Sequence, residues 1–174
     1  LVGYDEELDL AVLKIEAQGL VPARLGSSDQ LSVGDSVYAI GNPMGYLHGT
    51  MTEGIISSPT RTIPVDGKDM NLLQTSAALN SGNSGGALTN AYGQVVGITS
   101  AKITGVENDT VIEGLGLVIP INDTIPFLNQ MIHTGQSFRP SLGILCQEVQ
   151  MDDTSGVYVV STTADTPAHE VLLE

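Results

Sequence analysis

A single amphipathic helix among many short apolar segments limits what this chain can fold into more than any other feature. Apolar residues recur at helical spacing at Ile121, Ile125, Leu128 and Ile132. Asn122 or Asp123 would cap the start of this helix, and Gly135 would end it. Pro126 would fit its first turn. This is the one convincing helix in the sequence.

The other apolar segments are short and are separated by turn residues, as β-strands are. They cover residues 8–15, 36–40, 50–58, 87–89, 94–98 and 115–119. Pro59 is expected to end the third of them, with surface loops over residues 61–70 and 102–113. Glycine is abundant at 20 residues and tryptophan is absent, which also favours many short strands. The pattern predicts a mainly β domain, a barrel closed by the helix.

A second module is expected after the helix. Residues 136–140 are typical of a linker, and two further strands are predicted at residues 142–145 and 156–160. An apolar run after Pro167 could open another helix. We therefore expect one domain over residues 1–135 and the beginning of another over residues 141–174.

The acidic composition excludes some partners. The formal net charge is −14, with only 6 lysines and arginines, so nucleic acids and anionic lipids are repelled. The single Cys146 cannot form an internal disulfide, and it is expected to be a small core residue. No signal peptide or membrane span is present, and the abrupt ends at Leu1 and Glu174 suggest a piece of a longer protein.

Ser84 lies in a box of glycines, in the stretch Gly82-Asn83-Ser84-Gly85-Gly86. A serine nucleophile needs a base, a group that orients the base, and donors for the developing oxyanion. Glycines permit the dihedral angles that turn successive N–H groups toward one point. Taken alone, the motif is equally compatible with a glycine-rich hairpin turn.

Together with other segments in the same order, this box resembles the HtrA (Deg) family of trypsin-like serine proteases. The matching segments include Asp9-Leu10-Ala11-Val12-Leu13-Lys14-Ile15, Ala39-Ile40-Gly41-Asn42-Pro43, Gln74-Thr75, Gly93-Gln94-Val95-Val96-Gly97 and Gly116-Leu117-Val118-Ile119-Pro120. The resemblance implies a trypsin-like double β-barrel. This chain would hold the last strand of barrel one, all of barrel two, the closing helix and the start of a PDZ domain.

The resemblance assigns the catalytic nucleophile to Ser84 and the acid of the triad to Asp9. A triad acid is buried and orients the histidine. That role would explain an acid inside an apolar run, although a strand-end acid that caps a turn is the alternative. The family's histidine lies upstream of the acid, near a Thr-Asn-x-His-Val strand, and this sequence does not include it. The 174 residues alone are therefore expected to be inactive.

The same resemblance places the oxyanion hole at the N–H groups of Gly82 and Ser84, with Asn83 shaping the loop. It implies an apolar specificity pocket for small aliphatic side chains, flanked by Ala78, Leu79, Asn80, Ile98, Thr99 and Ser100. One residue departs from the family pattern: Ser76 stands where the family usually has Asp.

The histidines present are poor substitutes for the missing base. His48 would give a subtilisin-like order, but no βαβ alternation surrounds it, and a solvated loop position is favoured. His133 is expected to complement the helix dipole, and His169 is uninformative. Three scattered histidines argue against a metal site, and we expect no cofactor.

In the second module, Ser141, Leu142, Gly143 and Ile144 occupy the position of the carboxylate-binding loop of PDZ domains. The whole protein is therefore expected to be an ATP-independent endopeptidase for unfolded or misfolded proteins, whose complete PDZ domain binds peptide C-termini. By resemblance it would be trimeric, extracytoplasmic and membrane-anchored. The alternatives are a non-catalytic peptide-binding scaffold and a glycine-rich β-domain without a site.

Overall fold

The computed structural model describes residues 1–42, 49–65, 68–80, 82–100, 106–107, 110–111, 115–151 and 154–171. The chain divides into two compact units, Leu1–Ser137 and Phe138–Glu174, and each is described by itself. The division falls inside residues 136–140, where the sequence predicts a linker. Among the described helices, none is both long and apolar enough to cross a membrane.

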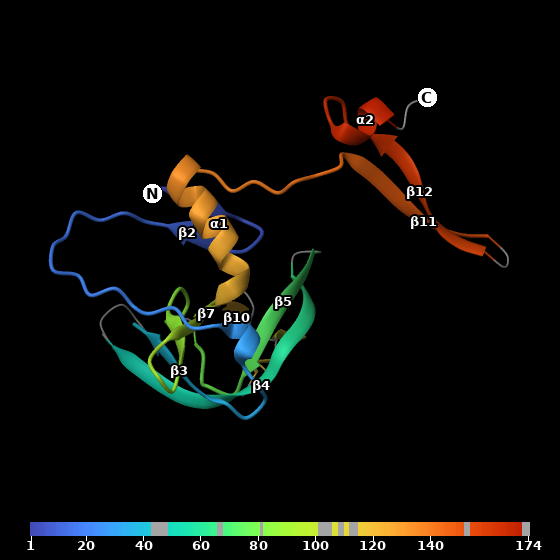
Figure 1. The fold of residues 1–174 in the computed structure, drawn as a ribbon. Coiled ribbons are helices and arrows are strands. Elements are labelled where there is room, and N and C mark those ends of the chain that lie inside the picture. The colour runs from blue at the N-terminus through green and yellow to red at the C-terminus, as the bar shows by residue number, and fades with distance from the viewer. Residues whose placement is uncertain are drawn as a thin grey trace. The chain divides into compact units, whose positions relative to one another are not determined.

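A closed β-barrel forms the body of the first unit (Figure 1). Its strands follow one another in the order β10-β5-β4-β3-β6-β7, and neighbouring strands are antiparallel. Their bounds are β3 Ser36–Gly41, β4 Thr50–Val65, β5 Lys68–Thr75, β6 Ala87–Asn90, β7 Val95–Thr99 and β10 Gly116–Pro120. Closure removes unpaired strand edges. The mainly β fold class and the barrel predicted from the sequence are confirmed.

Alternating side chains of these strands fill the barrel, because every second residue of a strand points inward. The main core cluster consists of Val37, Ala39, Ile56, Leu73, Ala77, Leu88, Val96 and Val118. A second cluster lies under the helix and is formed by Leu10, Leu72, Leu117, Ile119 and Met131. The hairpin predicted between residues 89 and 94 joins β6 to β7, and the Asn90 side chain accepts the N–H groups of Tyr92 and Gln94.

The strand β4 is longer than the sequence predicts. Pro59 does not end it, and part of the stretch predicted as a loop over residues 61–70 forms the ends of β4 and β5. The register between β4 and β5 shifts between Ile56 and Ser58 and again between Ser58 and Arg61. A bulge of this kind accommodates a proline, which cannot donate a ladder hydrogen bond, without ending the strand.

A short hairpin precedes the barrel. Strands β1 (Gly3–Asp5) and β2 (Leu10–Val12) form a separate two-stranded sheet. The strand predicted over residues 8–15 is therefore reduced to three residues, and the side chains of Leu13 and Ile15 are 71% and 66% exposed. The cause is that β2 pairs only with β1 among the described strands.

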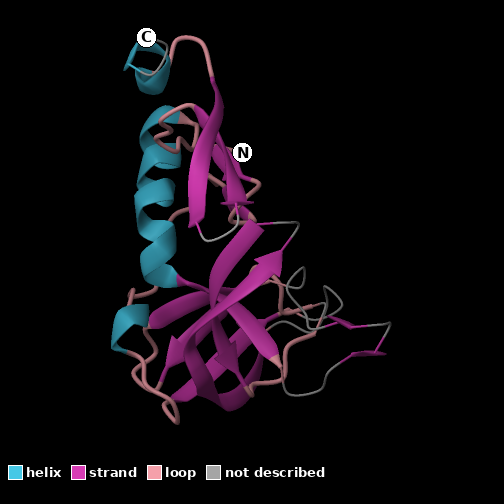
Figure 2. Ribbon diagram, turned by 90° about the vertical axis from the view of Figure 1, so that its right-hand side faces the viewer, coloured by secondary structure: helices cyan, strands magenta, loops and turns pink. Residues whose placement is uncertain are grey.

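Helix α1 (Ile121–Thr134) follows β10 and lies beside the β1–β2 hairpin (Figures 1 and 2). It begins two or three residues earlier than predicted, with Pro120 rather than Asn122 or Asp123 as the N-cap, so Pro126 falls in the second turn rather than the first. Gly135 ends the helix as predicted, in the left-handed conformation with φ 75°. The helix start is tied to the 3₁₀ turn η1 (Ser28–Gln30), because Asn122 bonds to Ser27, Ser28 and Asp29.

The second unit contains a hairpin and a short helix. Strands β11 (Ile144–Met151) and β12 (Thr154–Thr162) pair antiparallel, and α2 (Pro167–Val171) follows them. All three were predicted, although the strands are longer than expected. Two further short strands of the first unit, β8 (Val106–Glu107) and β9 (Thr110–Val111), pair inside the predicted loop, whose other residues up to position 114 lie outside the described residues.

Candidate functional site

Ser84 is exposed in a tight turn that runs from Gly82 to Gly85. The Asn83 N–H donates to the Asn80 carbonyl at 3.0 Å, and the Gly86 N–H donates to the Asn83 carbonyl at 2.8 Å. Gly85 has φ 76°, a conformation that disfavours any residue with a Cβ. The glycine box thus holds an exposed serine at the tip of a sharp turn.

Thr99, the last residue of β7, fastens this serine loop to the barrel. Its N–H donates to the Gly86 carbonyl at 3.0 Å, and its carbonyl accepts the Gly85 N–H at 2.8 Å. Its hydroxyl, which is buried, also donates to the carbonyls of Asn83 and Gly86. The position of the loop is therefore set by β7 as well as by its own glycines.

A second attachment joins the loop to β4 through one carbonyl. The Ala78 carbonyl accepts the Thr52 hydroxyl at 2.8 Å and the Asn83 side-chain amide at 3.2 Å. Asn83 is almost completely buried, and its side chain lies against Gly41, where a Cβ would be only 2.5 Å from Oδ1. Asn83 is therefore a buried residue whose side chain and backbone both bond within the serine loop and its approach.

Asp9 ends the turn between β1 and β2, and its side chain is exposed. The prediction of a buried acid at this position is wrong for the described chain, because β2 is short and only one side of it is covered. Asp9 has φ 55°, which costs a residue with a Cβ on the order of 1 kcal/mol. Its Oδ2 accepts the hydroxyl of Ser100 at 2.7 Å.

Two consecutive residues therefore link the serine loop to the acid. Thr99 binds the loop that carries Ser84, and Ser100 binds Asp9. Ser100 is buried, so its hydroxyl is a fixed donor rather than a solvated one. The end of β7 thus connects two groups that lie 75 positions apart in the sequence (84 − 9).

One of the two candidate oxyanion donors already has a hydrogen-bond acceptor inside the loop. The N–H of Gly82 donates to Asn80 Oδ1 at 3.2 Å, within the loop itself. This side-chain contact occupies one of the two N–H groups that the sequence assigns to the oxyanion hole. The Gly82 N–H must exchange Asn80 Oδ1 for the substrate oxygen if it is to stabilise an oxyanion.

The residues expected to flank a specificity pocket serve several different purposes. Leu79 packs against the barrel core, where it faces Gly116. Ile98 packs against the other cluster, under α1. The hydroxyls of Thr99 and Ser100 are engaged with the loop and with Asp9, as described above. Of the predicted pocket residues, Ala78 and Asn80 contact the serine loop directly through hydrogen bonds.

Ser76 has a local partner that gives it a structural explanation. Its hydroxyl oxygen accepts the Ile55 N–H at 3.0 Å, and its own N–H donates to the Ile55 carbonyl at 3.1 Å. Thr75 adds a hydroxyl bond to the same carbonyl at 2.8 Å. An aspartate in place of Ser76 would offer the same N–H a carboxylate acceptor, so the serine preserves this pairing without a charge.

No described histidine supplies the base. His133 lies at the end of α1, with Nδ1 2.7 Å from the Asn129 carbonyl, and His169 lies in the second unit, 2.9 Å from the Thr162 hydroxyl. His48 lies outside the described residues. The part of the chain that the structure describes also contains no cluster of three or more potential metal ligands.

A cavity of about 670 Å³ lies beside Asp9. Its walls come from the β1–β2 hairpin and from the adjoining ends of β4 and β5, and they include Tyr4, Leu10, Val65, Lys68 and Met70. Apolar and charged groups are thus exposed together beside Asp9. The cavity leaves room for another group next to the acid.

In the second unit, the predicted carboxylate loop is a compact strand entry. Gly143 has φ 72°, and its N–H donates to the Ser141 hydroxyl at 3.1 Å. The carbonyls of Leu142 and Gly143 accept the N–H groups of Ala168 and Thr163. Leu142 itself is exposed, and Ile144 begins β11.

Comparison with known proteins identifies the family. The trypsin-like peptidase domain matches residues 1–98. The chain is 42% identical over 191 residues to the serine protease Do-like HtrB of Bacillus subtilis (strain 168), covering 98% of this chain and 41% of that protein. It is 43% identical over 152 residues to a "probable periplasmic serine endoprotease DegP-like" of Hahella chejuensis (strain KCTC 2396), covering 87% of this chain and 31% of that protein.

Among solved structures, the HtrA-type protease AlgW with a decapeptide superposes with a TM-score of 0.81 and 36% identity, covering 97% of this chain and 53% of that one. The chain thus spans about half the length of that structure and less than half the length of the two relatives above. The sequence motifs, the closed barrel and these similarities agree, and the chain belongs to the HtrA/Deg family of trypsin-like serine proteases.

Proposed function

We propose that the full-length protein is a serine endopeptidase that cleaves unfolded or misfolded proteins through an acyl-enzyme. Ser84 attacks the scissile carbonyl, and the N–H groups of Gly82 and Ser84 stabilise the oxyanion, with Asn83 shaping the loop. Asp9 orients the histidine base and stabilises its imidazolium form. Acyl transfer of this kind needs no nucleotide, so the reaction is independent of ATP.

The link made by Thr99 and Ser100 carries this proposal. A hairpin turn without a function would not need a buried hydroxyl that reaches a distant acid, and Ser100 does this at 2.7 Å from Asp9 Oδ2. The same strand end holds the loop of Ser84. The loop of the nucleophile and the side chain of the acid are therefore both held by residues 99 and 100, at the end of one strand, which favours the fixed geometry that catalytic groups require.

The base is proposed to come from a segment upstream of Leu1 in the full-length protein. The relatives are longer than this chain, and the cavity beside Asp9 offers space for such a group. We therefore expect the 174-residue chain to show only the residual reactivity of a triad without its base.

The test is labelling by a serine-directed fluorophosphonate. The full-length protein should be labelled and should cleave casein, and Ser84→Ala should abolish both. The 174-residue chain should be labelled at least about 10³-fold more slowly. A full-length protein that is folded but is not labelled, and that still binds peptides, would establish the non-catalytic scaffold instead.

The second unit is proposed to be the start of a PDZ domain, with residues 136–140 as the linker. In the complete domain, the loop of Ser141, Leu142, Gly143 and Ile144 would hold a peptide C-terminus on backbone N–H groups. The glycine with φ 72° inside this loop supports that role. Binding of a labelled peptide with a free or an amidated C-terminus tests it, since only the free carboxylate should bind.

An extracytoplasmic location is proposed from the name of the Hahella relative, which is called periplasmic. A membrane anchor and a trimeric assembly would depend on segments outside this chain. Fractionation and the sedimentation behaviour of the full-length protein test these two proposals separately.

A further inference from the structure

The buried acid of the hairpin is Asp5 rather than Asp9. Asp5 is only 4% exposed, and it stands at the end of β1, directly opposite Leu10 of β2. The four residues between them form the turn that ends in Asp9. A buried carboxylate is costly unless hydrogen bonds compensate it, so its partners indicate what it is for.

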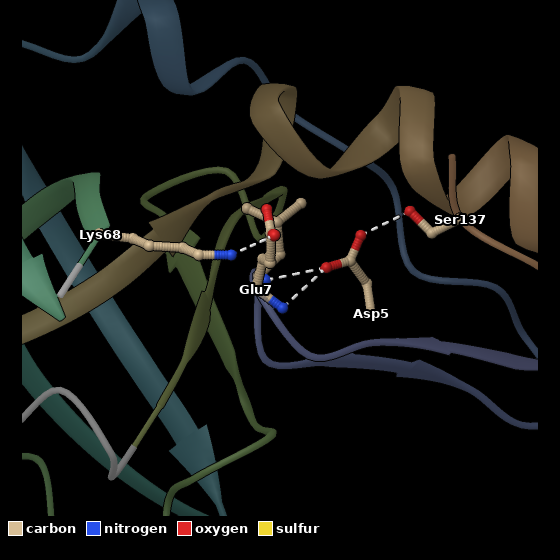
Figure 3. Close-up of polar contacts among 5 residues, drawn as sticks. Asp5, Glu7, Lys68 and Ser137 are labelled. Atoms are coloured by element: carbon tan, nitrogen blue, oxygen red, sulfur yellow. Dashed lines mark hydrogen bonds and ion pairs between the residues drawn. The ribbon is translucent and has the colours of Figure 1, made fainter. Parts of the chain in front are cut away.

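The two oxygens of Asp5 face different parts of the chain (Figure 3). Oδ1 accepts the backbone N–H groups of Glu7 and Leu8, each at 3.0 Å. Oδ2 accepts the hydroxyl of Ser137, which follows α1. One carboxylate therefore holds two N–H groups inside the turn and fixes that turn to the segment after the helix.

Asp9 depends on this turn for its direction. As the last residue of the turn, it adopts φ 55°, which a residue with a Cβ holds only when its surroundings enforce it. Charge-assisted bonds to backbone N–H groups are roughly twice as strong as neutral ones. The bonds from Asp5 lie one and two residues before Asp9, so they constrain the backbone from which its side chain projects.

Besides the bonds from Asp5 and the bond between Ser100 and Asp9, a further polar contact of the turn is a weaker support. Lys68 pairs with Glu7, but both side chains are substantially exposed (Figure 3). Exposed ion pairs of this type contribute little to a fixed geometry, because solvent screens them and both side chains lose freedom. Asp5 thus fixes the backbone of the turn at Glu7 and Leu8, whereas the bond from Ser100 holds only the carboxylate of Asp9 at its end.

We propose that Asp5 is a positioning residue, which holds the turn of residues 6–9 so that Asp9 meets Ser100 and orients the base. Asp5 bonds to backbone groups and to Ser137, and it acts on the reaction only through Asp9. The inference rests on the proposed catalytic role of Asp9.

The first test compares variants of the full-length protein by their rate of fluorophosphonate labelling and by thermal unfolding. Asp5→Ala should lower the rate about 10- to 100-fold, as expected for a catalytic group displaced by about 1 Å. Asp5→Asn should stay within roughly threefold of the wild type, because its Oδ1 still accepts both N–H groups. Glu16→Gln, an exposed charge change in the segment after β2 and outside the cavity, should have no effect.

The second test separates positioning from a general loss of structure. In an Asp9→Asn background, which is already slowed by the loss of the acid, Asp5→Ala should cause little further decrease, since both changes act through one group. An equal decrease in both backgrounds, or a folded Asp5→Ala protein with the wild-type rate, overturns the inference. If Asp5→Ala does not fold, Ser137→Ala and Asp5→Asn take its place, and Ser137→Ala removes the donor to Oδ2. A wild-type labelling rate for Ser137→Ala together with a tenfold slower rate for Asp5→Asn would also overturn the inference.

A failure of the proposed function would give a different pattern of labelling rates from a failure of the positioning role. If Asp9→Asn alone leaves the labelling rate unchanged, then Asp9 is not the triad acid, and both proposals fall. If Asp9→Asn is slowed but Asp5→Ala is not, only the positioning role of Asp5 is overturned.

Discussion

The hydroxyl of Ser100 donates to Oδ2 of Asp9 at 2.7 Å, across 91 positions of sequence. Ser100 is buried, whereas Asp9 is exposed and lines the adjacent cavity. The bond therefore fixes one oxygen of the acid and leaves the carboxylate accessible from the adjacent cavity. An acid arranged in this way can accept a further donor such as an imidazole N–H.

Removal of the Ser100 hydroxyl should weaken catalysis without unfolding the protein. A hydrogen bond to a charged group contributes about 1.5–3 kcal/mol. Ser100→Ala should therefore lower kcat/KM of the full-length protein by about tenfold or more. Steady-state cleavage of a peptide substrate measures this effect. Ser58→Ala removes a hydroxyl from an exposed bond on β4 and serves as the control, with no change expected.

An unchanged kcat/KM in Ser100→Ala, with Ser84→Ala inactive, would contradict a role for this bond in holding the acid. A decrease in Ser58→Ala of the same size would show that the assay reports stability rather than geometry. Thermal unfolding of both variants distinguishes these cases.

Elements with strong local signals could be predicted from the sequence. The helix stripe through Ile125 and Leu128, the stop at Gly135 and the hairpin around Asn90 all depend on residues close together in the chain. The barrel strands β3, β6, β7 and β10 followed from the same kind of signal, whereas β5 was not predicted. These elements are confirmed because local propensity and tertiary packing favour the same conformation.

Features that depend on distant partners could not be predicted. Pro59 is a strong strand breaker, but a bulge opposite β5 lets β4 continue through it. The bond between Ser100 and Asp9 could not be predicted, because the two residues lie 91 positions apart. Asp5 could have been noticed from its position four residues before Asp9, but only the fold shows that Asp5, rather than Asp9, is the buried acid.

A side chain at Gly54 should damage the attachment of the serine loop. A Cβ there would lie 2.2 Å from the backbone nitrogen of Ala77, and backbone cannot move away as a flexible side chain can. Overpacking of this kind costs about 1–3 kcal/mol. We expect Gly54→Ala to lower the free energy of unfolding in urea by that amount and to slow the labelling of Ser84.

Gly156 offers a matched control on another strand. The nearest atom to a Cβ at this position is 3.8 Å away, so Gly156→Ala meets no steric obstacle. Its unfolding free energy should change by less than about 0.5 kcal/mol. If the two variants are equally stable, the close approach of β4 to the Ser76–Ala77 backbone is not a constraint on the loop.

The first turn of α1 should make stability depend on pH. Burial, and then repulsion from Asp29, raise the pKa of Asp123 above its usual value of 3.8. A carboxyl whose pKa is higher in the folded state binds its proton more tightly there, so its contribution to stability improves as the pH falls through that pKa. Asp123→Asn should therefore raise the Tm at pH 7, and the difference from the wild type should shrink as the pH is lowered toward 4.

Circular dichroism melts of the 174-residue chain and of Asp123→Asn over this pH range measure the effect. Asp29→Asn should give part of the same gain, because it removes only the repulsion. A Tm difference that grows as the pH falls would have the wrong sign and would contradict the raised pKa.

The contact between Asn80 and Gly82 should limit the reactivity of Ser84. The Gly82 N–H must leave Asn80 Oδ1 before it can bind an oxyanion, and a neutral hydrogen bond contributes about 0.5–1.5 kcal/mol. In the full-length protein, Asn80→Ala should therefore increase the rate of fluorophosphonate labelling by about 2- to 10-fold, since the N–H no longer has an internal acceptor. Asn80→Asp should decrease it, because a carboxylate holds the same N–H more strongly. Rates of labelling that are the same in both variants would show that the Gly82 N–H does not bind the developing oxyanion.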